Sequence, residues 1–70
     1  MNIELVKNEI AKNIGKRVMV TVYGMRNKVD RYEGIILNTY PNIFTINYEG
    51  AEKSFTYREI ITKDVKIKYL

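Results

Sequence analysis

The residues of this sequence best suited to chemistry are its cations. Arg26, Lys28 and Arg31 fall within six residues of one another after an alternating apolar stretch, and Lys16 and Arg17 precede that stretch. Such a cluster can bind an anionic partner, or it can keep the tip of a β-hairpin soluble. The local sequence leaves both interpretations open.

The charge is polarised along the chain. The net charge is +4; residues 1–31 carry seven cations and three carboxylates, whereas residues 32–70 carry five of each. A basic half of this kind favours an anionic partner, either nucleic acid or an acidic protein surface. A charge of this size also suits a small domain that only needs to stay soluble.

Tyrosines accompany these cations. Tyr23, Tyr32 and Tyr40 flank the basic and the proline-containing turns, where aromatic rings could stack on the bases of a single strand. The same residues also suit the rim of a thin β core, with the hydroxyl in water. The predicted partner-binding or nucleic-acid-binding residues are Lys16, Arg17, Tyr23, Arg26, Lys28, Arg31 and Tyr40.

The sequence offers little for catalysis. It has no histidine and no cysteine, and Ser54, its one serine, has no evident base. The commonest general base, neutral metal ligand and strong nucleophile are therefore missing, and the four glycines match no nucleotide-binding fingerprint. We predict no enzymatic activity, no metal and no cofactor. The lack of cysteine and of a long apolar run predicts a cytoplasmic protein without a membrane partner.

The hydrophobic pattern begins with a helix and then changes period. Apolar residues recur every three or four positions over about 3–13, with Asn2 as the N-cap and Gly15 just beyond the end. From Arg17 to Tyr23 the period is two, with three valines pointing one way. We therefore expect one amphipathic helix followed by a first strand.

Four more strands are expected, at 32–37, 43–48, 53–57 and 65–69. Turns separate them at 39–42 and 49–52, and residues 58–62 read as a one-turn connector. Gly34, inside the second strand, suggests a bend or bulge. We assign Phe44, Ile46 and Phe55 to the core, and Lys66 and Lys68 to the outer side of the last strand, where they guard its edge.

This order predicts a single domain over residues 1–70. Its fold class is mainly β with one N-terminal helix: a small five-stranded SH3-like or Sm-like partly open barrel over about 16–70, with the helix plugging one open end. An open barrel leaves free strand edges, so a homodimer is also compatible with the sequence.

Three motifs resemble the Veg family of small proteins from Gram-positive bacteria. They are Gly-Lys-Arg at 15–17, Thr-Tyr-Pro-x-x-Phe at 39–44 and Ser-Phe-x-Tyr at 54–57, and the similarity runs from about Ile3 to Tyr69. The resemblance implies a single Veg-like domain in a cytoplasmic, non-enzymatic regulator. Such a protein stimulates biofilm formation by acting on the transcription of matrix genes and countering a repressor.

An alternative function is an Sm-like module that binds RNA or single-stranded nucleic acid as a ring. Residues 58–65 resemble the second motif of bacterial Sm-like RNA chaperones, a similarity that bears on the fold. The mass in solution separates the two hypotheses, because a monomer or dimer excludes a ring.

Overall fold

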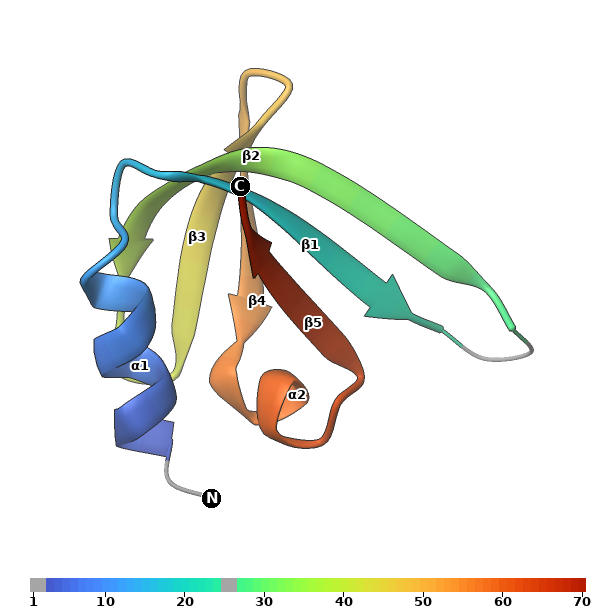
Figure 1. Cartoon of the computed structure of the whole chain (residues 1–70), viewed down its shortest axis with the longest axis horizontal. Helices are drawn as coiled ribbons and strands as arrows, with labels where there is room; N and C mark the ends of the chain where they lie inside the picture. The colour runs from blue at the N-terminus through green and yellow to red at the C-terminus, as the bar shows by residue number, and fades with distance from the viewer. Residues whose placement is uncertain (1–2, 25–26) are drawn as a thin grey trace.

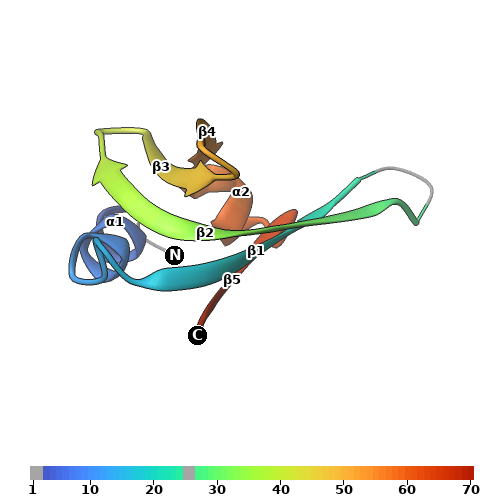
Figure 2. The same cartoon turned by 90° about the horizontal axis from the view of Figure 1, so that it is seen from above.

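The computed structural model describes residues 3–24 and 27–70, which form five strands and two helices (Figure 1). All strand pairs are antiparallel, in the order β4-β3-β2-β1-β5. The curled sheet stays open between β4 and β5, as the view from above shows (Figure 2). The predicted fold class is therefore confirmed. The elements are α1 (Ile3–Ala11), β1 (Arg17–Tyr23), β2 (Val29–Thr39), β3 (Ile43–Tyr48), β4 (Ala51–Thr56), α2 (Tyr57–Ile61) and β5 (Val65–Tyr69).

The first helix ends two residues earlier than predicted. Residues 12–15 form a turn in which the Asn13 amide donates to the Ile10 carbonyl at 2.9 Å. Gly15 adopts φ +90°, and its amide donates to the Ile36 carbonyl at 2.8 Å. This positive φ is easy only for glycine and turns the chain from α1 into the sheet. The predicted cap, Asn2, lies outside the described residues.

Strand β2 is longer at both ends than the predicted 32–37. It pairs with β1 over residues 29–35 and with β3 over residues 35–39. The polar ends of β2 form strand because β1 and β3 supply hydrogen-bond partners for their backbone groups. The alternation of side chains does not predict such backbone pairing.

The predicted bulge is not at Gly34, although β2 does curve along its length (Figure 1). The register irregularity lies between Ile36 and Asn38, on the side of β2 that faces β3. At Gly34, an added Cβ would collide with the backbone carbonyl of Asn47. Glycine is therefore required here for close approach of two backbones.

The connector between β4 and β5 is the helix α2. The Glu59 amide donates to the Thr56 hydroxyl at 3.2 Å, and the Thr56 amide donates to the Glu59 carboxylate at 3.3 Å. This reciprocal capping box satisfies backbone groups at the helix start. As a result Tyr57 begins α2, whereas we had predicted it as the last residue of a strand.

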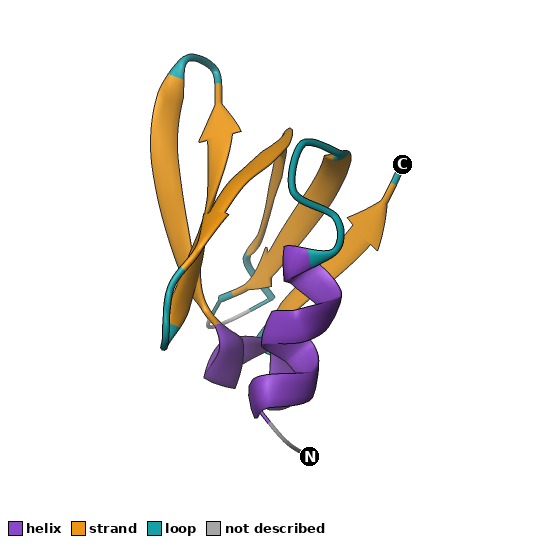
Figure 3. Ribbon diagram, turned by 90° about the vertical axis from the view of Figure 1, so that its left-hand side faces the viewer, coloured by secondary structure: helices purple, strands orange, loops and turns teal. Residues whose placement is uncertain are grey.

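The two helices lie together at one end of the sheet, where α1 packs against α2 and β2 (Figure 3). Beneath them and inside the curled sheet lies the core, which includes Phe44, Ile46 and Phe55 as predicted. The buried hydrophobic residues are Ile10, Val18, Val20, Ile36, Phe44, Ile46, Phe55, Tyr57 and Val65.

Candidate functional site

The alternation of β1 divides its side chains between two faces. Val18 and Val20 are fully buried on the inner face. Side chains alternate along a strand, so Arg17, Met19 and Tyr23 project from the outer face. The residues paired with the outward positions of β1 project from the same face. We call this outer surface of β5, β1 and β2 the basic face; its charged residues are Arg17, Arg31, Glu33, Lys66 and Lys68.

The register places the cations on both sides of β1. Thr21 pairs with Arg31 on β2 and with Lys66 on β5. Met19 pairs in the same way with Glu33 and Lys68. Strands separated by one intervening strand are roughly 10 Å apart, so each row spans about that width. Positive charge therefore flanks the central strand on both sides.

Glu33 is the one carboxylate on this face in the described part of the sheet. It lies 3.8 Å from the Arg17 guanidinium, measured nitrogen to oxygen, and both side chains are about half exposed or more. Such an exposed pair contributes little to stability. It leaves Arg31, Lys66 and Lys68 without a salt bridge among the described residues.

Exposed apolar side chains lie among these cations. Tyr23, Val29 and Ile35 are each about two-fifths exposed, and all three project from this outer face. The ammonium group of Lys66 lies 5.5 Å from the centre of the Tyr23 ring, a cation–π contact. The basic face is therefore mixed in chemistry: cationic, with exposed apolar or aromatic side chains at both of its ends.

The structure groups some of the predicted binding residues and separates others. Arg17, Arg31 and Tyr23 share the basic face. Lys16 is exposed just before β1, and Lys28 is exposed at the far tip of the β1–β2 hairpin, where its carbonyl accepts from the Gly24 amide at 2.7 Å. Arg26 lies outside the described residues.

Two of the tyrosines lie elsewhere. Tyr40 follows β2 at the end opposite the hairpin and borders a surface depression that includes Glu52. Tyr32 faces inward, with its ring 4.9 Å from that of Tyr48 and under the ammonium of Lys53 at 4.4 Å. Tyr32 is thus a structural residue, and Tyr40 is not part of the basic face.

Our predicted site omitted Lys66 and Lys68. The signal was present, because these lysines alternate with the apolar residues Val65, Ile67 and Tyr69. We had assigned them only to protection of a strand edge. Their place beside β1 depends on β5 pairing with β1, two segments far apart in the sequence.

The described residues contain neither a cluster that could hold a metal ion nor a helix that could cross a membrane. No three carboxylate side chains among them gather closely enough to hold a metal ion. Neither described helix has the length and apolarity needed to cross a bilayer.

The fold and this face define the class: a small, partly open antiparallel β domain with a cationic outer surface. The chain belongs to the Veg family, since the family model described as "Biofilm formation stimulator VEG" matches residues 1–68. This match confirms the resemblance seen in the sequence motifs. No curated protein matches the chain.

Proposed function

We propose that this protein is a non-enzymatic regulator that acts by binding, with its basic face holding an acidic surface of a protein partner. The observation that carries the proposal is the grouping of Arg17, Arg31, Lys66 and Lys68 on one sheet face. The family description as a biofilm formation stimulator supports a regulatory role. The proposal places the protein in the cytoplasm, acting on a transcriptional regulator.

The chemistry of the face favours a protein over a phosphate backbone. Protein interfaces are enriched in Tyr, Met and Arg, and this face contains Met19 and Arg31 in its middle and Tyr23 at its hairpin end. A single strand of nucleic acid would need several free aromatic rings for stacking. Tyr32 is packed inside and Tyr23 already contacts Lys66, so few rings are offered.

The test is capture of partners from the native cell by the tagged full-length protein, with and without nuclease. We expect capture to survive nuclease and to be lost in the double variant Arg31→Ala/Lys68→Ala. The matched control is Lys12→Ala/Arg58→Ala, which removes the same charge from two exposed cations outside the basic face. Equal capture by both double variants would contradict the proposal.

A second measurement addresses nucleic acid directly. Retention on heparin, on a DNA duplex and on single-stranded RNA is measured from about 50 to 200 mM salt, because phosphate contacts give a steep salt dependence. We expect the wild type to be retained only weakly. The face variant, Arg31→Ala/Lys68→Ala, and the control double variant should reduce this retention equally. A steep salt slope lost only in the face variant would assign the face to nucleic acid instead.

A further inference from the structure

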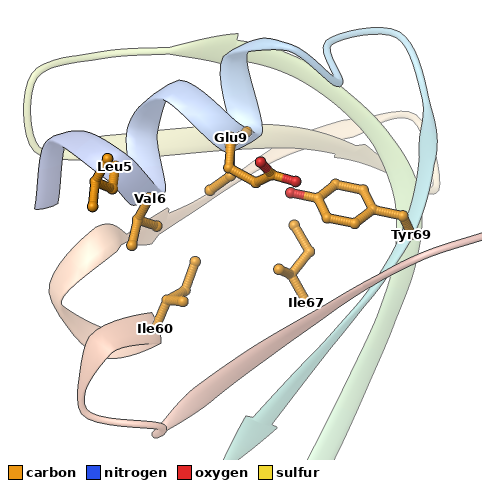
Figure 4. Close-up of a pocket in the computed structure, with 7 residues that line it drawn as sticks. Leu5, Val6, Glu9, Ile60, Ile67 and Tyr69 are labelled. Atoms are coloured by element: carbon orange, nitrogen blue, oxygen red, sulfur yellow. The ribbon is translucent and has the colours of Figure 1, made fainter. Parts of the chain in front are cut away.

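An apolar groove lies between α1, α2 and β5, away from the basic face. Its cavity is about 360 Å³, within the range of small binding pockets. Figure 4 shows α1 along one side, with α2 and β5 opposite. The lining residues are Leu5, Val6, Glu9, Ile10, Ile60, Ile67 and Tyr69.

Strand alternation separates this groove from the basic face. Lys66 and Lys68 project from the outer side of β5, whereas Ile67 and Tyr69 line the groove on the inner side. One short strand thus serves two surfaces of opposite chemistry. Substitutions in the groove can be made without touching the cations.

The apolar side chains that line the groove differ in how far they are buried. Ile10, at its floor, is 1% exposed, but Leu5 on the same helix is 66% exposed. Val6, Ile60 and Ile67 are only half-buried. Leu5 is therefore the groove residue whose apolar side chain is most available to a partner.

The polar groups of the groove converge at one end. In Figure 4 the Glu9 carboxylate and the Tyr69 hydroxyl point toward one another across it. Burial, and then the negative charge of Glu9, raise the pKa of the Tyr69 hydroxyl. Among the described residues, Glu9 is the one charged residue that lines the groove. The Glu9 carboxylate can accept a charge-assisted hydrogen bond from a lysine or arginine of a partner that lies in the groove.

We propose that this groove binds a helical segment of a partner protein that carries an apolar side chain and, one turn further along, a lysine or arginine. Leu5 and Glu9 are four residues apart on α1, which is about 6 Å along the helix axis. A helix that lies along α1 and runs in the same direction would place its own apolar residue beside Leu5 and its cation beside Glu9. The contact is of the helix-in-groove kind.

The probe is an alanine-rich helical peptide of about 15 residues, long enough to be partly helical alone. It carries Leu and, four residues later, Lys. Two matched peptides replace Lys by Glu or Leu by Ser. Chemical-shift titration of the ¹⁵N-labelled full chain should show perturbations at the groove residues for the Leu–Lys peptide, and weaker binding of both other peptides.

The net positive charge of the protein works against the expected preference for the Lys peptide over the Glu peptide. A chain of net charge +4 attracts the Glu peptide non-specifically, so a preference for the Lys peptide must come from a local carboxylate. Glu9→Gln should lower the affinity for the Leu–Lys peptide about fivefold and leave the affinity for the Leu–Glu peptide unchanged. Glu52→Gln, an exposed carboxylate on the far strand β4, is the matched control and should bind as wild type.

The apolar half of the site has its own variant. Leu5→Ser should weaken the Leu–Lys peptide without loss of fold, because Leu5 is largely exposed; Ile35→Ser, on the outer face, is the control. Perturbations outside the groove, equal binding of the Lys and Glu peptides, or a dimer of this chain that fills the groove would each overturn the inference.

The variant Arg31→Ala/Lys68→Ala should bind the Leu–Lys peptide as the wild type does. A failure of the groove inference is therefore distinct from a failure of the proposed function of the basic face.

Discussion

At the scale of single residues, Gly34 and Tyr57 show how tightly a 70-residue chain is packed. Gly34 lets the backbones of β2 and β3 approach closely. Tyr57 is fully buried at the start of α2, and its hydroxyl makes no well-formed hydrogen bond within the described residues. Both positions allow sharp tests of the core.

Gly34→Ala should be strongly destabilising. The new methyl group would meet the Asn47 carbonyl, which belongs to the backbone and can move only with its strand. We expect the free energy of unfolding to fall by about 1–3 kcal/mol, measured by urea denaturation. At Gly24 an added Cβ has ordinary contacts, so Gly24→Ala is the control and should have little effect. Equal losses in the two variants would show that the steric argument is wrong.

The burial of the Tyr57 hydroxyl leads us to expect that the protein loses stability at alkaline pH. Burial raises the pKa of its hydroxyl, and the neighbouring Tyr40 backbone and Thr39 side chain offset this only in part. The unfolded chain, with a tyrosine pKa of about 10, therefore loses this proton first as the pH rises. The free energy of unfolding should be constant below pH 10 from this cause and fall above it.

The measurement is thermal unfolding from pH 7 to pH 11. Tyr57→Phe should make the alkaline fall smaller, leaving the part that comes from the raised pKa of Tyr69, and should keep the free energy of unfolding at pH 7 within about 1 kcal/mol. Tyr40→Phe, which changes an exposed ring, is the control and should follow the wild-type curve. A Tyr57→Phe curve that coincides with the wild type would assign the alkaline loss to other groups.

At the scale of elements, α2 depends on its cap. Five residues are too few for a helix to be stable alone, so the capping box of Thr56 and Glu59 and the packing on α1 must hold it. The cap also fixes Ile60, which lines the apolar groove. Loss of the cap should therefore affect both stability and peptide binding.

Thr56→Ala should lower the free energy of unfolding by about 1 kcal/mol, the usual value of an N-cap. In a domain of this size that is roughly 4–8 °C in Tm, which calorimetry resolves easily. Ser54→Ala, two residues earlier on β4 and exposed, is the control and should shift Tm little. No difference between the two variants would mean that the capping box is dispensable.

At the scale of the whole molecule, α1 closes one end of an open sheet. Its attachment rests on Ile10, which is 1% exposed and belongs to the core cluster, while Leu5 on the same helix projects into the groove. A chain this short buries only about 60% of its unfolded surface, so the loss of one such anchor matters.

Ile10→Ala should cost about 2–5 kcal/mol, because it removes buried methyl groups and leaves a cavity. This is a large part of the 5–15 kcal/mol typical of a whole domain. Leu5→Ala should cost far less, since its side chain is mostly in water. Urea denaturation of both variants distinguishes them; equal costs would show that α1 is not held by Ile10.

Much of the fold could be read from the sequence. The strands Arg17–Tyr23, Ile43–Tyr48 and Val65–Tyr69 agree with the prediction residue for residue, because their side chains alternate clearly. The ends of β2 could not be predicted, since one end is held by backbone pairing with β1 and the other by backbone pairing with β3. Tyr57 was misplaced because we overlooked the Thr-x-x-Glu capping box at 56–59.

The sequence by itself determined which side of each strand is cationic, because alternation assigns every side chain to one of two faces. Only the tertiary structure decided which strands are neighbours. β5 lies against β1, so Lys66 and Lys68 join Arg17 and Arg31, although more than thirty residues separate the two segments. Tyr32 faces away from that surface because it alternates with Arg31 along β2, whereas Tyr40 lies beyond the far end of β2. Strand neighbours depend on how the sheet curls over its core, a property of the assembled chain that no local pattern encodes.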